Sequence, residues 1–221
     1  MNADPRAGQP VPPELLVDIA QLVSAYYERT PDPDNPDQKV SFGTSGHRGS
    51  ALNNSFNEAH ILAITEAICD YRHQQGYAGP VFIGKDTHAL STPAEMSALR
   101  VFASRGVTVM VERDGGYTPT PVISHAILCH NRAHADALAD GVVITPSHNP
   151  PDNGGIKYNP PTGGPADTDA TGWIAARANE LLADPGFAGP DISIDQAMTR
   201  DTTHRHDFMT PYIEDLRNVV D

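Results

Sequence analysis

The sequence predicts an α/β domain in which a mostly parallel, mixed sheet is sandwiched between helices. Short apolar runs alternate along the chain with longer segments in which apolar residues recur at helical spacing. Glycine and proline separate these segments, and no stretch approaches the roughly 18 apolar residues that a membrane span needs. Strands that are apolar throughout and separated by helices are typical of parallel sheets that are covered on both faces.

The first helices follow from local signals. Apolar residues spaced along one face predict a helix over 14–28, which ends before the three prolines of 30–37. A second helix is expected to begin after Asn57 as its cap, to run to Gln75 and to stop at Gly76.

The remaining elements are shorter or less strongly marked. Ser91 is expected to cap a helix that has proline in its first turn and ends near 105–106. We expect further helices over 119–131, 169–182 and 208–220, and strands over 40–42, 81–83, 107–111 and 142–144.

These elements divide the chain into three parts. Residues 1–38 are expected to form an N-terminal helix and a linker rich in proline and aspartate. Residues 39–205 are expected to form the α/β domain that carries the chemistry, and 206–221 a helix that connects it to a second domain.

The distribution of charge narrows the possible functions. The formal net charge of −13 disfavours non-specific binding to nucleic acid, which requires a basic surface. Residues 39–160, however, hold 9 Lys and Arg against 10 Asp and Glu, a net charge of −1. This nearly neutral centre leaves room for a local site that binds an anion.

The chain has two cysteines, Cys69 and Cys129, and both lie in predicted helices. This low number excludes a disulfide scaffold, and we expect both to be small core residues. The first nine residues lack the basic and apolar regions of a secretory signal, so we expect a cytoplasmic protein.

The segment that follows the predicted strand 142–144 carries the clearest chemical signal. Ile144 to Lys157 reads ITPSHNPPDNGGIK, with three prolines and two glycines. Pro146 favours an extended residue before it, and the prolines then predict a stiff, exposed corner that presents Ser147. A corner of this kind at the carboxyl end of a strand is a common place for a ligand site in α/β folds.

This corner has three interpretations. A serine hydrolase is disfavoured, because the neighbouring His148 would point to the opposite side of an extended chain and no G-x-S-x-G elbow is present. A serine that carries a phosphoryl group fits better, since Asn149 and Lys157 can hold a phosphate or exchange a proton. A purely structural, proline-rich turn remains open on this segment alone.

Two more loops follow predicted strands. Residues 43–50 contain three glycines with Thr44, Ser45 and Arg48, a composition suited to an anion, although a flexible turn fits equally well. In the loop 84–91, Lys85 and His88 are expected to add positive potential, and Asp86 to give structural support.

Together these loops resemble the α-D-phosphohexomutases, most closely the bacterial phosphoglucomutase branch that acts on α-D-glucose phosphates. His88 and Pro146 stand where many members carry other residues, but both fit this branch. The resemblance rests on the segments FGTSGHRG (42–49), KDTHALS (85–91), TPSHNP (145–150) and GGIKYNPP (154–161), with RAGQP (6–10) and FNE (56–58) in addition.

The resemblance implies specific roles for the motif residues. Ser147 corresponds to the phosphoserine of the family, whose phosphate also ligates an essential Mg²⁺, and Lys157 to its general acid/base. His148 and Asn149 correspond to the positions beside the phosphoserine, and the resemblance allows His148 a part in proton transfer. Substrate contacts are implied for Arg48, Ser45, Thr44 and Asn149.

The implied activity is the interconversion of glucose 1-phosphate and glucose 6-phosphate through glucose 1,6-bisphosphate, with hexose phosphate as substrate. Family members have four domains, and this chain matches the first, so the rest of the same enzyme is the expected partner. The Asp-x-Asp-x-Asp-Arg metal motif is absent from the sequence, and the 221 residues alone are therefore expected to be inactive. A mutase for mannose, glucosamine or pentose phosphates, or a sugar-phosphate binding module without chemistry, are the alternatives.

Overall fold

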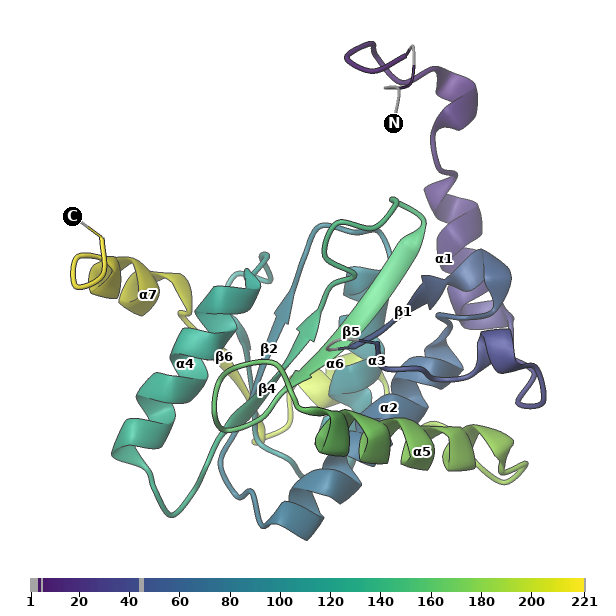
Figure 1. Ribbon diagram of the computed structural model, residues 1–221. Coiled ribbons are helices and arrows are strands. Elements are labelled where there is room, and N and C mark those ends of the chain that lie inside the picture. The colour runs from purple at the N-terminus through teal and green to yellow at the C-terminus, as the bar shows by residue number, and fades with distance from the viewer. Residues whose placement is uncertain (1–3, 5, 44–45, 221) are drawn as a thin grey trace.

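The computed structural model describes residues 4, 6–43 and 46–220, and its centre is a sheet of six strands in the order β1-β5-β4-β2-β3-β6. Figure 1 shows this sheet with its helices. The strands are β1 (Gly46–Ser50), β2 (Val81–Lys85), β3 (Val109–Glu112), β4 (Asp140–Ile144), β5 (Asn153–Asn159) and β6 (Thr203–His206).

The sheet is mixed, and its two halves differ in strand direction. Strand β2 pairs in parallel with β3 and β4, and β3 pairs in parallel with β6. Strand β5 pairs antiparallel with both β1 and β4. The predicted α/β class with a mostly parallel, mixed sheet is therefore confirmed.

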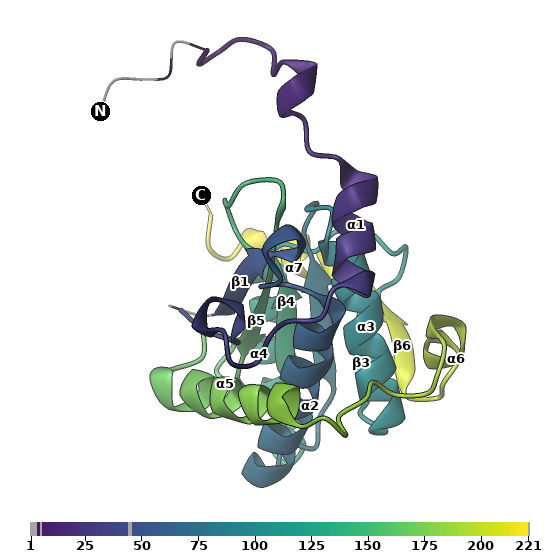
Figure 2. The same ribbon diagram turned by 90° about the vertical axis from the view of Figure 1, so that its right-hand side faces the viewer.

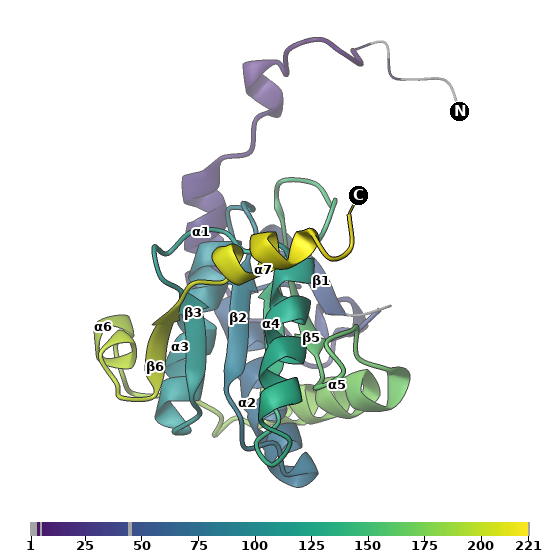
Figure 3. The same cartoon turned by 90° about the vertical axis from the view of Figure 1, so that its left-hand side faces the viewer.

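Helices cover both faces of the sheet. Helices α2, α3 and α5 lie on one face, and α4 with α7 lies on the other, as Figures 2 and 3 show from opposite sides. The helices are α1 (Ile19–Glu28), α2 (Glu58–Gln75), α3 (Ser91–Ser104), α4 (Thr120–Ala133), α5 (Thr168–Ala183), α6 (Ile194–Met198) and α7 (Met209–Leu216).

Side chains that point alternately to the two faces of the central strands form two hydrophobic cores. Ile83 and Val142 are buried toward α2, α3 and α5, whereas the neighbouring Phe82 and Val143 pack with the residues of α4 and α7. Because successive side chains of a strand point to opposite faces, the apolar runs of β2 and β4 supply both cores at once. This arrangement fixes the ends of β2 and β4, from which the candidate site projects.

Several predicted helices are confirmed, with changes at their ends. Helix α2 has Asn57 as its cap and ends at Gly76, whose φ of 72° is left-handed. The helix predicted over 14–28 begins only at Ile19, because Asp18 caps it there through the backbone N–H of Gln21. Residues 13–15 form a separate 3₁₀ turn, and residues 6–18 project away from the sheet (Figure 2).

Other boundaries were predicted wrongly. Ser91 is the first residue of α3 rather than its cap, and its hydroxyl donates instead to Asp86 Oδ1 at 2.6 Å. The strand predicted over 40–42 is reduced to a single bridge between Phe42 and His47. The helix predicted over 208–220 ends at Leu216.

Further elements and the exposure of one cysteine differ from the prediction. Strands β5 and β6 and the short helix α6 had not been predicted, and β1 lies in a segment expected to be a loop. Cys69 is buried as expected, but Cys129 is exposed, because it lies on the outer side of α4. Among the described residues, no helix is long and apolar enough to cross a membrane.

Candidate active site

Ser147 lies just beyond the carboxyl end of β4 and is exposed. Its φ is 79°, in the left-handed region that residues with side chains rarely adopt. The backbone N–H of Ser147 donates to Thr145 Oγ1 at 2.9 Å, which holds the corner closed. The predicted exposed corner is thus confirmed, although Ser147 itself is not extended.

Lys157 contacts the hydroxyl of Ser147 directly. Its Nζ donates to Ser147 Oγ at 2.7 Å. The sheet brings the two together, because Lys157 of β5 lies opposite Val143 of β4, at the end of the strand from which the serine corner emerges. Partial burial lowers the pKa of the Lys157 ammonium, and the nearby charge of Arg48 lowers it further, whereas Asp86 opposes the shift. Lys157 is therefore more readily deprotonated than an ordinary surface lysine.

Arg48 approaches the same corner from the other side of β5. It lies in β1 opposite Gly155, and its Nε donates to the carbonyl oxygen of Pro146 at 2.9 Å. No described residue accepts from its terminal guanidinium nitrogens. The structure therefore brings together three predicted residues, Ser147, Lys157 and Arg48.

The other predicted residues of this corner are placed less uniformly. His148 is exposed beside Ser147, whereas Asn149 is half-buried and its side chain donates to Asn153 Oδ1 at 3.2 Å. Thr44 and Ser45, also predicted to contact substrate, lie outside the described residues.

Two of the three glycines in the segment 43–50 allow close packing of strand β1. Gly46 and Gly49 belong to β1, and a Cβ on Gly46 would lie 2.4 Å from the carbonyl oxygen of Ile156. A Cβ on Gly49 would lie 2.3 Å from the carbonyl oxygen of Ser55. These two residues therefore let β1 approach its neighbours closely, and residues 46–50 form a strand where a loop had been expected over 43–50.

A cavity of about 340 Å³ lies beside Ser147, between the loop after β2 and the start of α4. Asp86 lines it and supports the loop as predicted, by accepting from the Ser91 hydroxyl and from the backbone N–H of His88. Lys85 does not add positive potential there, because its ammonium is buried and donates to Glu95 Oε2 at 2.7 Å. The expectation for Lys85 was therefore wrong.

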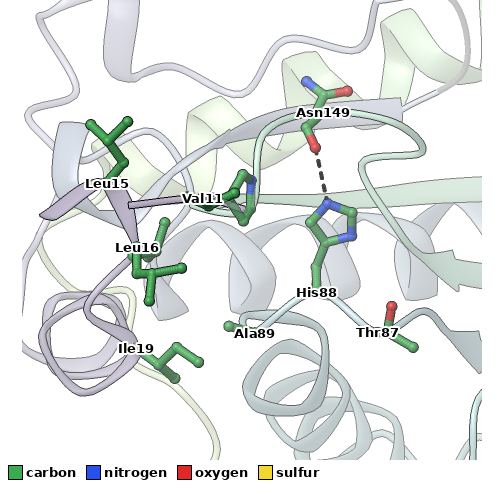
Figure 4. Close-up of a pocket in the computed structure, with 10 residues that line it drawn as sticks. Val11, Leu15, Leu16, Ile19, Thr87, His88, Ala89 and Asn149 are labelled. Atoms are coloured by element: carbon green, nitrogen blue, oxygen red, sulfur yellow. Dashed lines mark hydrogen bonds between the residues drawn. The ribbon is translucent and has the colours of Figure 1, made fainter. Parts of the chain in front are cut away.

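A larger cavity of about 710 Å³ adjoins the site on the side of the N-terminal segment. Figure 4 shows Val11, Leu15, Leu16 and Ile19 facing His88 and Asn149 across this cavity. Its lining is mostly apolar, unlike that of the cavity beside Ser147.

The described residues do not by themselves fit a magnesium ion. They contain no group of three or more His, Cys, Asp or Glu side chains that could hold a metal. Ser147 is the expected ligand, and the nearby Asp86 is already engaged by His88 and Ser91. Since Mg²⁺ requires near-octahedral oxygen coordination, further ligands from outside this set would be needed.

Two contacts at the site had not been predicted. Gly155 lies against the corner, since a Cβ there would be 2.4 Å from the carbonyl oxygen of Thr145 and 2.6 Å from Pro146 Cα. His88 contacts the backbone of Asn149, with its Nε2 3.2 Å from the carbonyl oxygen. The two glycines at 154–155 were a visible signal for close packing, whereas nothing in the sequence indicated which backbone atom His88 would reach.

Comparison with known proteins identifies this arrangement. Residues 39–183 match the family model described as phosphoglucomutase/phosphomannomutase, alpha/beta/alpha domain I. The phosphoglucomutase of Komagataeibacter xylinus is 58% identical over 220 residues, which cover 100% of this chain and 40% of that protein. The phosphoglucomutase/phosphomannomutase of Thermococcus kodakarensis is 30% identical over 181 residues, or 81% of this chain and 36% of that protein.

Solved structures show the same fold. A Thermus thermophilus protein assigned as a phosphomannomutase superposes with a TM-score of 0.67 at 25% identity, over 87% of this chain and 37% of that one. The Paramecium protein pp63/parafusin, a phosphoglucomutase in its open form, gives a TM-score of 0.63 at 23% identity over 87% and 36%. The chain thus spans about 40% of the length of the relatives it matches. It belongs to the phosphoglucomutase/phosphomannomutase family and contains that family's domain I.

Proposed function

We propose that this chain is the phosphoryl-carrying domain of a phosphoglucomutase, in which Ser147 accepts and returns the phosphoryl group. The observation that carries the proposal is the 2.7 Å contact between Lys157 Nζ and Ser147 Oγ at an exposed, left-handed corner. A proton-exchanging group beside an accessible hydroxyl is what a reversible phosphate carrier needs. The 58% identity to a phosphoglucomutase supports the choice of glucose phosphates.

In the proposed reaction, a hydroxyl oxygen of glucose 1-phosphate or glucose 6-phosphate attacks the phosphorus carried by Ser147. The bond between phosphorus and Ser147 Oγ breaks, a new phosphate ester forms on the sugar, and the hydroxyl proton passes to Lys157. The resulting glucose 1,6-bisphosphate reorients in the site, so that its other phosphate faces Ser147. Ser147 Oγ then attacks its other phosphate, Lys157 returns the proton to the departing sugar oxygen, and the isomeric monophosphate leaves.

The surrounding charges suit this cycle. Phosphorylation adds roughly −1.5 to −2 charge at Ser147, which the cationic groups of Lys157 and Arg48 would face. The Nε of Arg48 is held by the Pro146 carbonyl, so its terminal nitrogens are aimed by the backbone of the same corner. In this proposal Arg48 and Asn149 hold phosphate oxygens, Thr44 and Ser45 add substrate contacts, and His148 is a secondary proton-exchanging group.

Mg²⁺ is part of the proposal only for the longer protein. When bound, it would neutralise charge on the phosphate of Ser147, with ligands supplied by other parts of that protein. The steps assigned above to Lys157 and Arg48 use only the side chains of this chain.

The proposal is tested by mass measurement on the longer protein. After incubation with glucose 1,6-bisphosphate, we expect the intact mass to increase by one phosphate, and Ser147→Ala to abolish both this increase and mutase activity. Ser104→Ala is a matched control, because Ser104 is an exposed serine at the far end of α3. A phosphate that persists in Ser147→Ala would contradict the assignment of the carrier.

The same material distinguishes the alternatives. Faster turnover of mannose, glucosamine or pentose 1-phosphate than of glucose 1-phosphate would point to another phosphosugar mutase. Binding of glucose 1-phosphate without any phosphate on the protein would point to a binding module.

A further inference from the structure

The loop that carries Ser147 is tied to the loop after β2 through one imidazole ring. His88 Nδ1 lies 2.8 Å from Asp86 Oδ2, and its Nε2 lies 3.2 Å from the carbonyl oxygen of Asn149. Figure 4 shows the second of these contacts, with the His88 ring pointing directly at the Asn149 backbone. The side chain of His88 is only 16% exposed, so the ring is held in place by its surroundings.

Both ring nitrogens of His88 face hydrogen-bond acceptors. A carboxylate and a carbonyl oxygen accept hydrogen bonds and do not donate them. The His88 ring therefore bridges one acceptor on the loop after β2 and a second acceptor on the Ser147 loop.

The anchor at the other end of this tie is itself fixed. Asp86 accepts from Ser91 Oγ at 2.6 Å and from the backbone N–H of His88 at 2.9 Å. Burial of the Asp86 carboxyl acts to raise its pKa, but the hydrogen bonds from Ser91, Thr145 and His88 outweigh it, and the net shift is downward. These contacts thus run from Ser91 at the start of α3, through the Asp86 carboxylate and the His88 ring, to the Ser147 loop.

The Ser147 corner is held on two sides in the same manner. Arg48 donates to the carbonyl oxygen one residue before Ser147, and His88 contacts the carbonyl oxygen two residues after it. One contact comes from β1 and the other from the loop after β2, so two separate elements hold the corner in place. A serine in a left-handed conformation needs this restraint, because the unrestrained backbone favours other conformations.

We propose that His88 is a positioning residue for the phosphoryl transfer, which acts by holding the Asn149 carbonyl so that Ser147 Oγ stays within reach of Lys157. This inference rests on the proposed function of Ser147. It assigns His88 no contact with substrate. Loss of the tie would let the corner relax and would lengthen the contact between Ser147 and Lys157.

The test compares three variants of the longer protein. His88→Gln removes the ring that bridges Asp86 and Asn149, and we expect kcat to fall about tenfold or more with little change in KM, since small misplacements of reacting groups are costly. His88→Arg supplies a planar side chain with several donors that can reach both acceptors, and should restore much of kcat. His73→Gln is the matched control, because His73 is exposed near the end of α2, before β2 begins.

Hydrogen exchange supplies a readout that does not depend on activity. We expect amide exchange over 147–150 to be faster in His88→Gln than in the wild type, and to slow again in His88→Arg, with the rest of the sheet unchanged. If His88→Gln fails to fold, Asp86→Asn replaces it, since it keeps the size of the side chain while removing the carboxylate that faces the ring.

The outcomes separate the two proposals. If the wild-type protein never carries phosphate, the proposed function fails, whereas the exchange experiment still decides whether His88 restrains the corner. Wild-type kcat and unchanged exchange in His88→Gln would overturn the inference. So would an equal loss in His88→Gln and His88→Arg with no change in exchange, which would show that the size of the ring matters rather than its hydrogen bonds.

Discussion

Lys157 is the residue whose ionisation most directly links the structure to a measurable rate. Its Nζ contacts Ser147 Oγ, and burial together with the charge of Arg48 lowers its pKa below the ordinary lysine value of 10.5. Only the neutral amine accepts a proton from the attacking sugar hydroxyl. For transfer from phosphorylated Ser147 to glucose 6-phosphate, the rate should therefore increase with pH and level off below pH 10.5.

The corresponding variant is Lys157→Arg, which keeps the positive charge but stays protonated throughout this range. We expect single-turnover transfer to slow by about 10² to 10⁴-fold and to lose its dependence on pH, as removal of a general base does. Lys39→Arg, at an exposed lysine, is the control. Wild-type transfer rates in Lys157→Arg would exclude Lys157 as the proton acceptor.

At the scale of single residues, the sequence predicted the positions of some site residues and not of others. Ser147, Lys157 and Arg48 do lie together, because β5 pairs with β1 on one side and with β4 on the other. Lys85 looked equally suitable but is buried against Glu95, a pairing across 10 residues that no local pattern indicates. His88 shows the opposite case, a residue whose contact with Asn149, 61 residues away, depends on tertiary structure.

At the scale of elements, β5 decides the geometry of the site. It places Lys157 opposite both β1 and β4, and its Gly155 leaves space for the corner that carries Ser147. This strand was not predicted because NGGIKYN contains two glycines and follows a proline-rich turn, which are signals of a loop. Pairing on both sides overrides that weak local preference.

Gly155→Ala tests this role of β5. The added Cβ would meet Thr145 and Pro146 within 2.6 Å, so the backbone before Ser147 must shift. We expect mutase activity to fall about tenfold or more, and the free energy of unfolding to fall by about 1–3 kcal/mol, as overpacking does. Gly164→Ala is the control, since a Cβ there meets nothing within 4 Å. Unchanged activity in Gly155→Ala would show that the corner tolerates displacement.

At the scale of the whole molecule, the predicted fold class is confirmed and the division of the chain into 1–38, 39–205 and 206–221 remains a prediction. The family model matches residues 39–183, which lie inside the middle part. Strands β2, β3 and β4 were predictable because each contains an apolar run, whereas β6 is polar and the edge strand β1 is rich in glycine, so neither was predicted.

The same scale yields a prediction about activity. We expect the 221-residue chain alone to give no measurable conversion of glucose 1-phosphate to glucose 6-phosphate, because its described residues hold no set of metal ligands. A coupled assay measures this, with the longer protein as the active reference and circular dichroism as the check that the chain is folded. Rapid turnover by the chain alone would contradict this expectation.

The left-handed conformation of Ser147 also has an evolutionary consequence. A residue with a side chain at a φ of 79° is less favourable by about 1 kcal/mol or more than glycine at the same place. Selection for stability alone would therefore drive this position toward glycine, which has no oxygen to offer. Under the proposed role of Ser147, the hydroxyl at this position comes at a cost in stability that glycine would avoid.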